Sequence, residues 1–301
     1  MFLNWLGTLP NAAAQGMVWG IMAIGVYITY KILDIADLTV DGPICTGGAT
    51  FAMLLLAGQP IPVCLLAAFL AGAAAGLITG VFHTFLGIPA ILAGILTQLM
   101  LWSINLKIMG KSNVSIPGRN YKLWVSSLLP SWQSLVVLVA AVTVLIILLY
   151  WFFGTEYGTS LRATGNNPAM SRAQGINTGA TKIFGLVLSN GVVALAGAFL
   201  AQYQGVSDVK MGQGAIVIGL AAIIIGDAIV SKISQNFAVR LLGVVLGGII
   251  YYFVYQTVIF LGLDSDLLKM LSALVVALFL GFPYVKKTYL GQKKKEGARH
   301  A

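Results

Sequence analysis

Long apolar runs separated by short polar stretches restrict the fold of this chain more than any other feature of its sequence. Each run is close to the about 20 residues that a helix needs to cross a bilayer. Hydrophobic residues make up 58% of the chain and charged residues 9%, whereas a soluble domain carries about 25% charged residues. The sequence therefore predicts an all-α polytopic membrane protein. The predicted spans are 12–33, 61–82, 88–107, 132–153, 183–203, 237–262 and 267–285.

Two shorter apolar stretches, 43–57 and 213–230, are interrupted by glycine and polar residues. Counting them gives about nine transmembrane segments, within a range of about eight to ten. We interpret the order of the segments as two inverted repeats with interrupted helices, an arrangement typical of transporters. The predicted single transmembrane domain covers 1–285, with repeat one at about 12–107, a connecting span at 132–153, a loop at 154–182 and repeat two at about 183–285, and a basic tail follows at 286–301.

The positions of the cations predict the orientation of the chain, because loops rich in lysine and arginine favour the cytoplasmic side. Loop 154–182 and tail 286–301 are both basic, so we place both in the cytoplasm and the N-terminus outside. Loop 108–131 also carries three cations, yet this arrangement places it outside, so that loop disagrees with the rule. The net charge of +9 does not indicate a nucleic-acid partner, because the cations flank apolar runs.

Small residues recur at helical spacing within several predicted spans. Backbones of membrane helices approach closely at such residues, so we expect these glycines to lie at helix contacts. The two cysteines stand in apolar surroundings without metal-ligand spacing, and we expect them to be packing residues rather than a disulfide or a metal site. The glycines concerned are Gly16, Gly20, Gly72, Gly76, Gly80, Gly243 and Gly247, and the cysteines are Cys45 and Cys64.

Polar residues that packing alone does not explain gather near the two interrupted segments. Non-helical backbone at membrane depth is tolerated where it is buried in protein or lines a wet cavity. These residues are candidates for a translocation pathway, although interfacial capping and hydrogen bonds between helices would explain them as well. No span has an ionisable residue securely at its centre, which argues against an ion-driven carrier. The pathway candidates are Asp37, Thr39, Asp41, Gly42, Gln98, Asn190, Gln202 and Tyr203.

Loop 154–182 is too long and too patterned for a simple connection. We expect a turn over 164–167, followed by a short helix that begins at Pro168 and stops at Gly175, since proline suits a first helical turn and glycine a C-terminal cap. A helix of about two turns is not stable alone in water. It therefore needs a partner into which it docks.

Four segments carry a resemblance to a known family: LRATGNNPAMSRAQGINTGATK, LDIADLTVDG, LSNGVVALAGAFLAQYQG and GQGAIVIGLAAIIIGDAI. They resemble ATP-binding-cassette permeases of the branched-chain amino acid and monosaccharide family, and look closest to the subgroup linked to amino acid uptake, including tryptophan or tyrosine systems. The resemblance implies that the short helix and its flanks enter a cleft on a cytoplasmic ATPase. The residues implied in this coupling are Gly165, Asn166, Asn167, Pro168, Met170, Arg172, Ala173, Gly175 and Ile176.

The resemblance also implies partners and a location. It implies two permease subunits, which we expect to be copies of one chain, two ATPase subunits and an extracytoplasmic solute-binding lipoprotein, in the cytoplasmic membrane of a prokaryote. The sequence has no GxxxxGK[ST] phosphate loop, so we expect ATP and Mg²⁺ to bind the ATPase, and this chain to hold no cofactor, metal or catalytic residue.

Two other interpretations stay open. An ion-coupled secondary transporter would move its solute without an ATPase, and the same class of importer could carry a sugar or a nucleoside instead of an amino acid. A membrane-embedded enzyme is disfavoured, because the chain has only two histidines and no HExxH motif.

Overall fold

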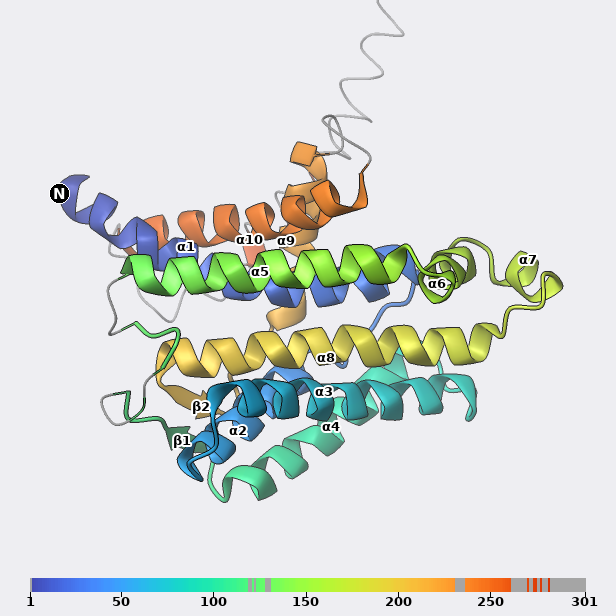
Figure 1. Ribbon diagram of the computed structural model, residues 1–301, viewed down its shortest axis with the longest axis horizontal. Helices are drawn as coiled ribbons and strands as arrows, with labels where there is room; N and C mark the ends of the chain where they lie inside the picture. The colour runs from blue at the N-terminus through green and yellow to red at the C-terminus, as the bar shows by residue number, and fades with distance from the viewer. Residues whose placement is uncertain are drawn as a thin grey trace, which may run out of the picture.

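The computed structural model describes residues 2–118, 121, 123–127, 131–230, 236–260, 270, 273–274, 277 and 281. Its long helices run side by side along the long axis of the molecule (Figure 1). The predicted last span, 267–285, lies outside the described residues apart from isolated positions, and the basic tail lies wholly outside them.

The described residues confirm an all-α membrane protein. Six helices are long and apolar enough to cross a bilayer: Gly7–Ile32, Ile61–Thr84, Ala90–Met109, Trp132–Phe153, Thr178–Gln204 and Phe237–Phe260. The elements in chain order are α1 (Phe2–Tyr27), η1 (Ile28–Ile32), α2 (Asp41–Leu56), α3 (Ile61–Thr84), α4 (Ala90–Met109), β1 (Asn113–Ser115), α5 (Ser131–Phe153), α6 (Glu156–Asn166), α7 (Pro168–Ala173), α8 (Thr178–Gln204), β2 (Val206–Asp208), α9 (Ala215–Val230) and α10 (Phe237–Phe260).

Helices α2 and α9 are shorter than a full crossing, as the interrupted apolar stretches predict. Each has 16 residues, or about 24 Å of helix, which falls short of the about 30 Å hydrocarbon core. Non-helical chain precedes both of them, at 33–40 before α2 and at 209–214 before α9. Each short helix and the chain before it together make one interrupted segment.

The helices of the two predicted repeats pack against one another in a reciprocal pattern. Helix α1 lies against α9 and α10, whereas α8 lies against α2 and α3 (Figure 1). Each first helix therefore contacts the short helix and the next long helix of the other repeat. A two-fold relation between the repeats would produce this pattern, and the inverted repeat itself stays a prediction.

The predicted close packing at small residues is confirmed. A Cβ at Gly76 of α3 would lie 2.8 Å from the carbonyl carbon of Leu186 in α8, and one at Gly20 of α1 would lie 3.0 Å from the Cα of Val245 in α10. Gly16 and Gly72, and in the second half Gly243 and Gly247, are equally confined. Without a hydrophobic force between helices in lipid, such contacts hold a bundle together by van der Waals packing.

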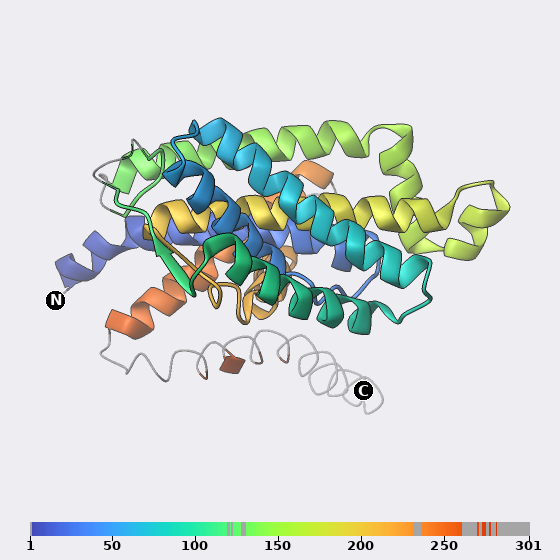
Figure 2. The same cartoon turned by 90° about the horizontal axis from the view of Figure 1, so that it is seen from below.

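The two ends of the bundle differ in what covers them. Strands β1 and β2 pair antiparallel at the C-terminal end of α8, whereas α6 lies beside its N-terminal end and α7 projects beyond that end (Figures 1 and 2). The N-terminus lies at the β1–β2 end (Figures 1 and 2). The described parts of loop 108–131 therefore lie at the opposite end from loop 154–182, as the predicted orientation requires, although the basic composition of the first loop disagrees with the charge rule.

Candidate functional site

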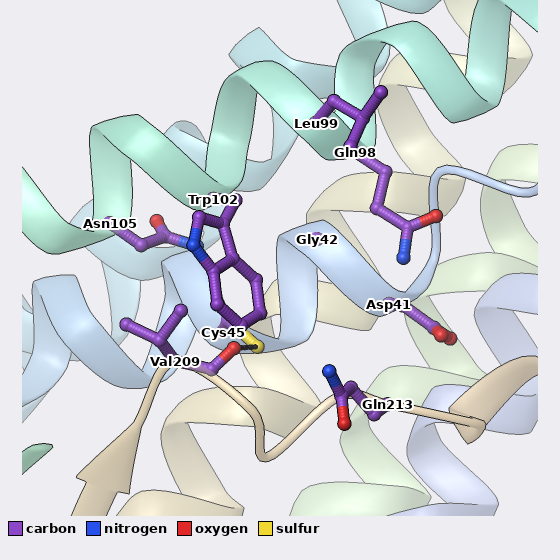
Figure 3. A pocket seen from close by; sticks show the side chains of 9 residues that line it. All are labelled: Asp41, Gly42, Cys45, Gln98, Leu99, Trp102, Asn105, Val209 and Gln213. Carbon is purple, nitrogen blue, oxygen red and sulfur yellow. Dashed lines mark hydrogen bonds between the residues drawn. The ribbon is translucent and has the colours of Figure 1, made fainter. Parts of the chain in front are cut away.

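A cavity of about 220 Å³ opens beside the first turn of α2, facing α4 and the non-helical chain before α9 (Figure 3). Both interrupted segments therefore contribute to one space. Three of the predicted pathway residues, Asp41, Gly42 and Gln98, line it. The lining residues are Asp41, Gly42, Cys45, Gln98, Leu99, Trp102, Asn105, Val209 and Gln213.

Asp41 joins the two short helices at this cavity. It is the first residue of α2, and its carboxylate accepts hydrogen bonds from the backbone N–H groups of Gly214, at 3.0 Å, and Ile216, at 3.2 Å. The carboxylate thereby satisfies N–H groups that the start of α9 leaves unpaired, and it lies at the positive end of that helix dipole. In transporters such half-helix N-termini commonly face anionic groups of a substrate.

Cys45 fixes the chain that leads into α9. Its Sγ donates to the carbonyl of Val209, at 3.0 Å, and accepts from the N–H of Gly212, at 3.3 Å. Gly212 in turn lies so close to the Asp41 carbonyl that no side chain would fit. The thiol is buried and free, so it packs and orients the non-helical segment.

The cavity wall on α4 extends beyond Gln98, the residue of this helix that was among the pathway candidates. Trp102 and Asn105 follow Gln98 on α4 at spacings of four and seven residues, so the three share one face of the helix. The Oδ1 atom of Asn105 is buried without a hydrogen-bond partner, which costs free energy unless something fills that position. This spacing was the signal in the sequence that could have identified the wall.

A second group of predicted residues forms a buried polar network away from the cavity lining. Asp37 is 3% exposed. Its Oδ1 accepts from the backbone N–H of Thr39, at 2.9 Å, and its Oδ2 accepts from Nδ2 of Asn190, at 2.8 Å. The Thr39 hydroxyl lies 2.9 Å from the hydroxyl of Thr79, which donates to that of Thr97 at 2.9 Å. The network holds the extended chain before α2 against α3, α4 and α8.

Gln202 and Tyr203 lie at the end of α8 near the β strands, away from the cavity lining. The Oε1 atom of Gln202 accepts from the N–H groups of Trp124, at 2.6 Å, and Val125, at 2.7 Å. The Tyr203 hydroxyl donates to the carbonyl of Asn11 at 3.4 Å. Both side chains thus have structural contacts that tie the chain at Trp124 and Val125, and helix α1, to α8.

The predicted turn over 164–167 is wrong. Residues Glu156–Asn166 form the helix α6, within which the Thr164 hydroxyl donates to the carbonyl of Ser160. Gly165 is needed for close packing instead, because a Cβ there would overlap the carbonyl oxygen of Ile32 in η1. Tertiary contact therefore keeps this glycine helical, against its ordinary preference.

The short helix of the loop is confirmed as α7, and both of its ends are capped. The side chain of Asn167 accepts from the N–H of Met170 at 3.0 Å, and Pro168 is the first helical residue. At the other end Gly175 has φ +83°, and the N–H of Ile176 bonds to the carbonyl of Ser171 at 3.0 Å. This closing pattern, with glycine in the left-handed conformation, is a Schellman motif.

The remaining coupling candidates lie on or beside α7. Met170 is 59% exposed, Ala173 and Asn166 are exposed, and Arg172 donates from Nε to the hydroxyl of Thr178 at 3.0 Å. Helix α7 packs mainly against α6 and α8 among the described elements, and its residues Ala169, Met170, Arg172 and Ala173 are exposed (Figure 1). Most of its surface is therefore free for another molecule.

Crossing helices, two half-length helices that meet at a polar cavity and a capped helix projecting from one end together define a membrane transport subunit. Residues 8–281 match the family model described as "Branched-chain amino acid transport system / permease component". The chain belongs to this family of ATP-binding-cassette permeases.

Several known proteins are similar to this chain. The tyrosine transport system permease protein of Clostridioides difficile is 42% identical over 271 residues, which cover 90% of this chain and 89% of that protein. The permease protein LsrC of the autoinducer 2 import system of Salmonella typhimurium is 28% identical over 260 residues, covering 83% of this chain and 69% of that protein. The solved structure of PsaBC from Streptococcus pneumoniae in complex with Fab shares the fold, with a TM-score of 0.55 at 17% identity, covering 97% of this chain and all of that one.

Proposed function

We propose that this chain is the membrane subunit of an ATP-driven importer that takes up an amino acid, with an aromatic amino acid favoured. The observation that carries the proposal is the position of α7. Six residues do not form a stable helix alone in water, yet α7 is capped at both ends and stands beyond the bundle. A preformed, exposed helix of this kind fits a cleft on a partner protein.

The contacts of the loop supply a route by which a partner could move the bundle. Helix α7 continues through Gly175 into α8, whereas α6 packs on η1 where Gly165 meets Ile32. A displacement of α7 therefore acts on α8 and on the end of α1. These two helices carry the reciprocal contacts with both short helices, so one motion would change both sides of the cavity.

The ATPase subunits, the solute-binding protein and the second permease would be separate chains. We place α6 and α7 in the cytoplasm, facing two ATPase subunits that bind ATP and Mg²⁺. A solute-binding lipoprotein would deliver the amino acid to the β1–β2 end, and a second copy of this chain would complete the membrane part. Binding of nucleotide to the ATPase and binding of the solute-carrying lipoprotein to this chain would then shift the same equilibrium between two conformations of the bundle.

The size and chemistry of the cavity support a small solute. Its volume of about 220 Å³ lies below the range of about 300–1,000 Å³ of drug-sized ligand sites. Trp102 and Leu99 offer apolar surface, whereas Asp41 and Gln98 offer hydrogen-bonding groups. A solute with an ammonium group and an aromatic ring would match both, in agreement with the tyrosine system named for the Clostridioides difficile relative.

Coupling is tested by placing a charge on α7. Ala173→Glu adds a carboxylate to an exposed position, so it should leave the fold intact and abolish co-purification with the ATPase. Thr159→Glu places the same charge on the exposed face of α6 and should retain the ATPase. Unchanged co-purification of the Ala173 variant would count against the docking role, and uptake by proteoliposomes without any ATPase would favour an ion-coupled carrier.

The solute is tested by uptake of labelled tyrosine in cells that express the whole importer. Gln98→Leu keeps the size of the side chain but removes its amide, so uptake should fall while the amount of protein in the membrane stays constant. Leu92→Ile, on an exposed position of the same helix, is the control. Competition by a sugar or a nucleoside, but not by tyrosine or tryptophan, would overturn the amino acid assignment.

A further inference from the structure

A second cavity, of about 380 Å³, lies at the opposite end of the bundle from the β strands and is lined mainly by basic and aromatic side chains. Its residues come from the end of α1 and η1, from α6 and from the start of α10. All three regions adjoin the ends of predicted spans, so the cavity lies at the level of lipid headgroups. The lining residues are Tyr27, Lys31, Ile32, Arg162, Asn166, Phe237 and Arg240.

The cavity has more positive than negative charge. Lys31, Arg162 and Arg240 line it, and the ion pair that the described residues form here joins Nζ of Lys31 to Asp227 at 2.9 Å. Neither arginine has a carboxylate within ion-pair distance among the described residues. Two guanidinium groups therefore share one cavity without a counter-ion from the described chain.

Aromatic rings hold Arg162 in place. Its guanidinium carbon lies 4.5 Å from the centre of the Phe237 ring and 5.2 Å from that of Phe153. Burial lowers the pKa of this guanidinium, because removal from water disfavours its charged form. The side chain is thus preorganised and partly desolvated, a state in which an anion restores the lost solvation.

We propose that this cavity binds the phosphate of an anionic membrane lipid, with Arg162 and Arg240 as the contacts to its oxygens. Guanidinium groups match the oxygens of a phosphate in pairs, and basic pockets between membrane helices on the cytoplasmic side are suited to anionic headgroups. The exposed apolar side chain of Ile229, on the neighbouring helix α9, offers surface for acyl chains. The bound lipid would link α1, α6 and α10.

The test measures lipid retention by the full chain purified in detergent. Native mass spectrometry would compare phosphatidylglycerol with phosphatidylcholine, and we expect a clear preference of the unaltered chain for phosphatidylglycerol. Arg162→Gln with Arg240→Gln should weaken phosphatidylglycerol binding about tenfold, because charge-assisted hydrogen bonds are lost, and should leave phosphatidylcholine unchanged. Lys182→Gln, which removes a cation outside this cavity at the same end of the bundle, should bind like the unaltered chain.

Two further arms distinguish the source of the phosphate and the effect on folding. Inorganic phosphate at millimolar concentration should not displace phosphatidylglycerol, and complete displacement would overturn the lipid assignment in favour of a small anion. Arg240→Lys keeps the charge and should show an intermediate affinity, which provides a second variant if the double variant does not fold. Equal binding of both lipids by the unaltered chain would refute the proposal.

Discussion

At the scale of single residues, long-range hydrogen bonds decide what the polar groups within the membrane do. The carboxylate of Asp37 is buried and receives its hydrogen bonds from Thr39 and from Asn190, which is distant in sequence. Asp41 receives its hydrogen bonds from Gly214 and Ile216 in the other half of the chain. Two acids four residues apart thus fasten the first interrupted segment to different partners.

The pairing of Asp37 can be tested by exchange. Asp37→Asn leaves one of two donors without an acceptor, and an unsatisfied buried group costs about 1–3 kcal/mol, so we expect a lower unfolding temperature and reduced uptake. Adding Asn190→Asp should recover part of both, because the amide introduced at position 37 could then donate to a carboxylate on α8. The two variants are compared by thermal unfolding in detergent, and no recovery would show that the carboxylate has a role beyond this pair.

At the scale of elements, close backbone contacts set which helices are neighbours. Helices α3 and α8 touch at Gly72 and Gly76, whereas α9 and α10 touch at Gly226 and Gly247. These contacts leave no room for a Cβ, so larger side chains would separate the helices. The same contacts position the short helices, since α2 packs against α3 and α8, and α9 packs against α10.

A methyl group at one of these contacts should loosen the bundle. Gly76→Ala places a Cβ 2.8 Å from the carbonyl carbon of Leu186 and 3.0 Å from the Cβ of Asn190, and overpacking of this kind costs about 1–3 kcal/mol. Gly7→Ala is the matched control, because a Cβ there meets nothing within 4 Å. The Gly76 variant should have a lower unfolding temperature than the Gly7 variant. Equal unfolding temperatures would mean that α3 can shift to accommodate the methyl group without loss of stability.

At the scale of the whole molecule, the two ends of the bundle differ in structure. The β1–β2 end holds the loops that Gln202 ties to α8, and the other end holds the projecting helix α7 (Figure 2). The proposed function requires that these ends face opposite sides of the membrane. The cavity beside Asp41 lies between them.

Cysteine labelling tests this orientation, because the native Cys45 and Cys64 are 4% and 0% exposed and should react little. Asn113→Cys places a thiol on the exposed face of β1, and Ala173→Cys places one on α7. An impermeant maleimide should label the first in intact cells and the second only after the membrane is opened. The reverse pattern would place α7 outside and exclude the ATPase contact.

Sequence alone identified the six crossing helices that the structure describes, the two interrupted segments, the small-residue contacts and the capped helix that starts at Pro168. These features follow from local composition and spacing, since an apolar run or a proline–glycine pair has the same preference in many contexts. The turn expected at 164–167 failed because packing against Ile32 keeps Gly165 in a helix. Tertiary contact outweighed the local preference there.

Only the tertiary structure decided which polar residues act together. Gln98, Trp102 and Asn105 share a helix face, but nothing in their spacing says that Asp41 and Gln213 lie opposite them. The eight pathway candidates therefore fall into three groups: those that line the cavity, those in the buried polar network around Asp37, and Gln202 and Tyr203, which hold neighbouring chain to α8. The physical reason is that burial and hydrogen bonding between distant segments arise when helices pack, whereas hydropathy and capping act within one segment.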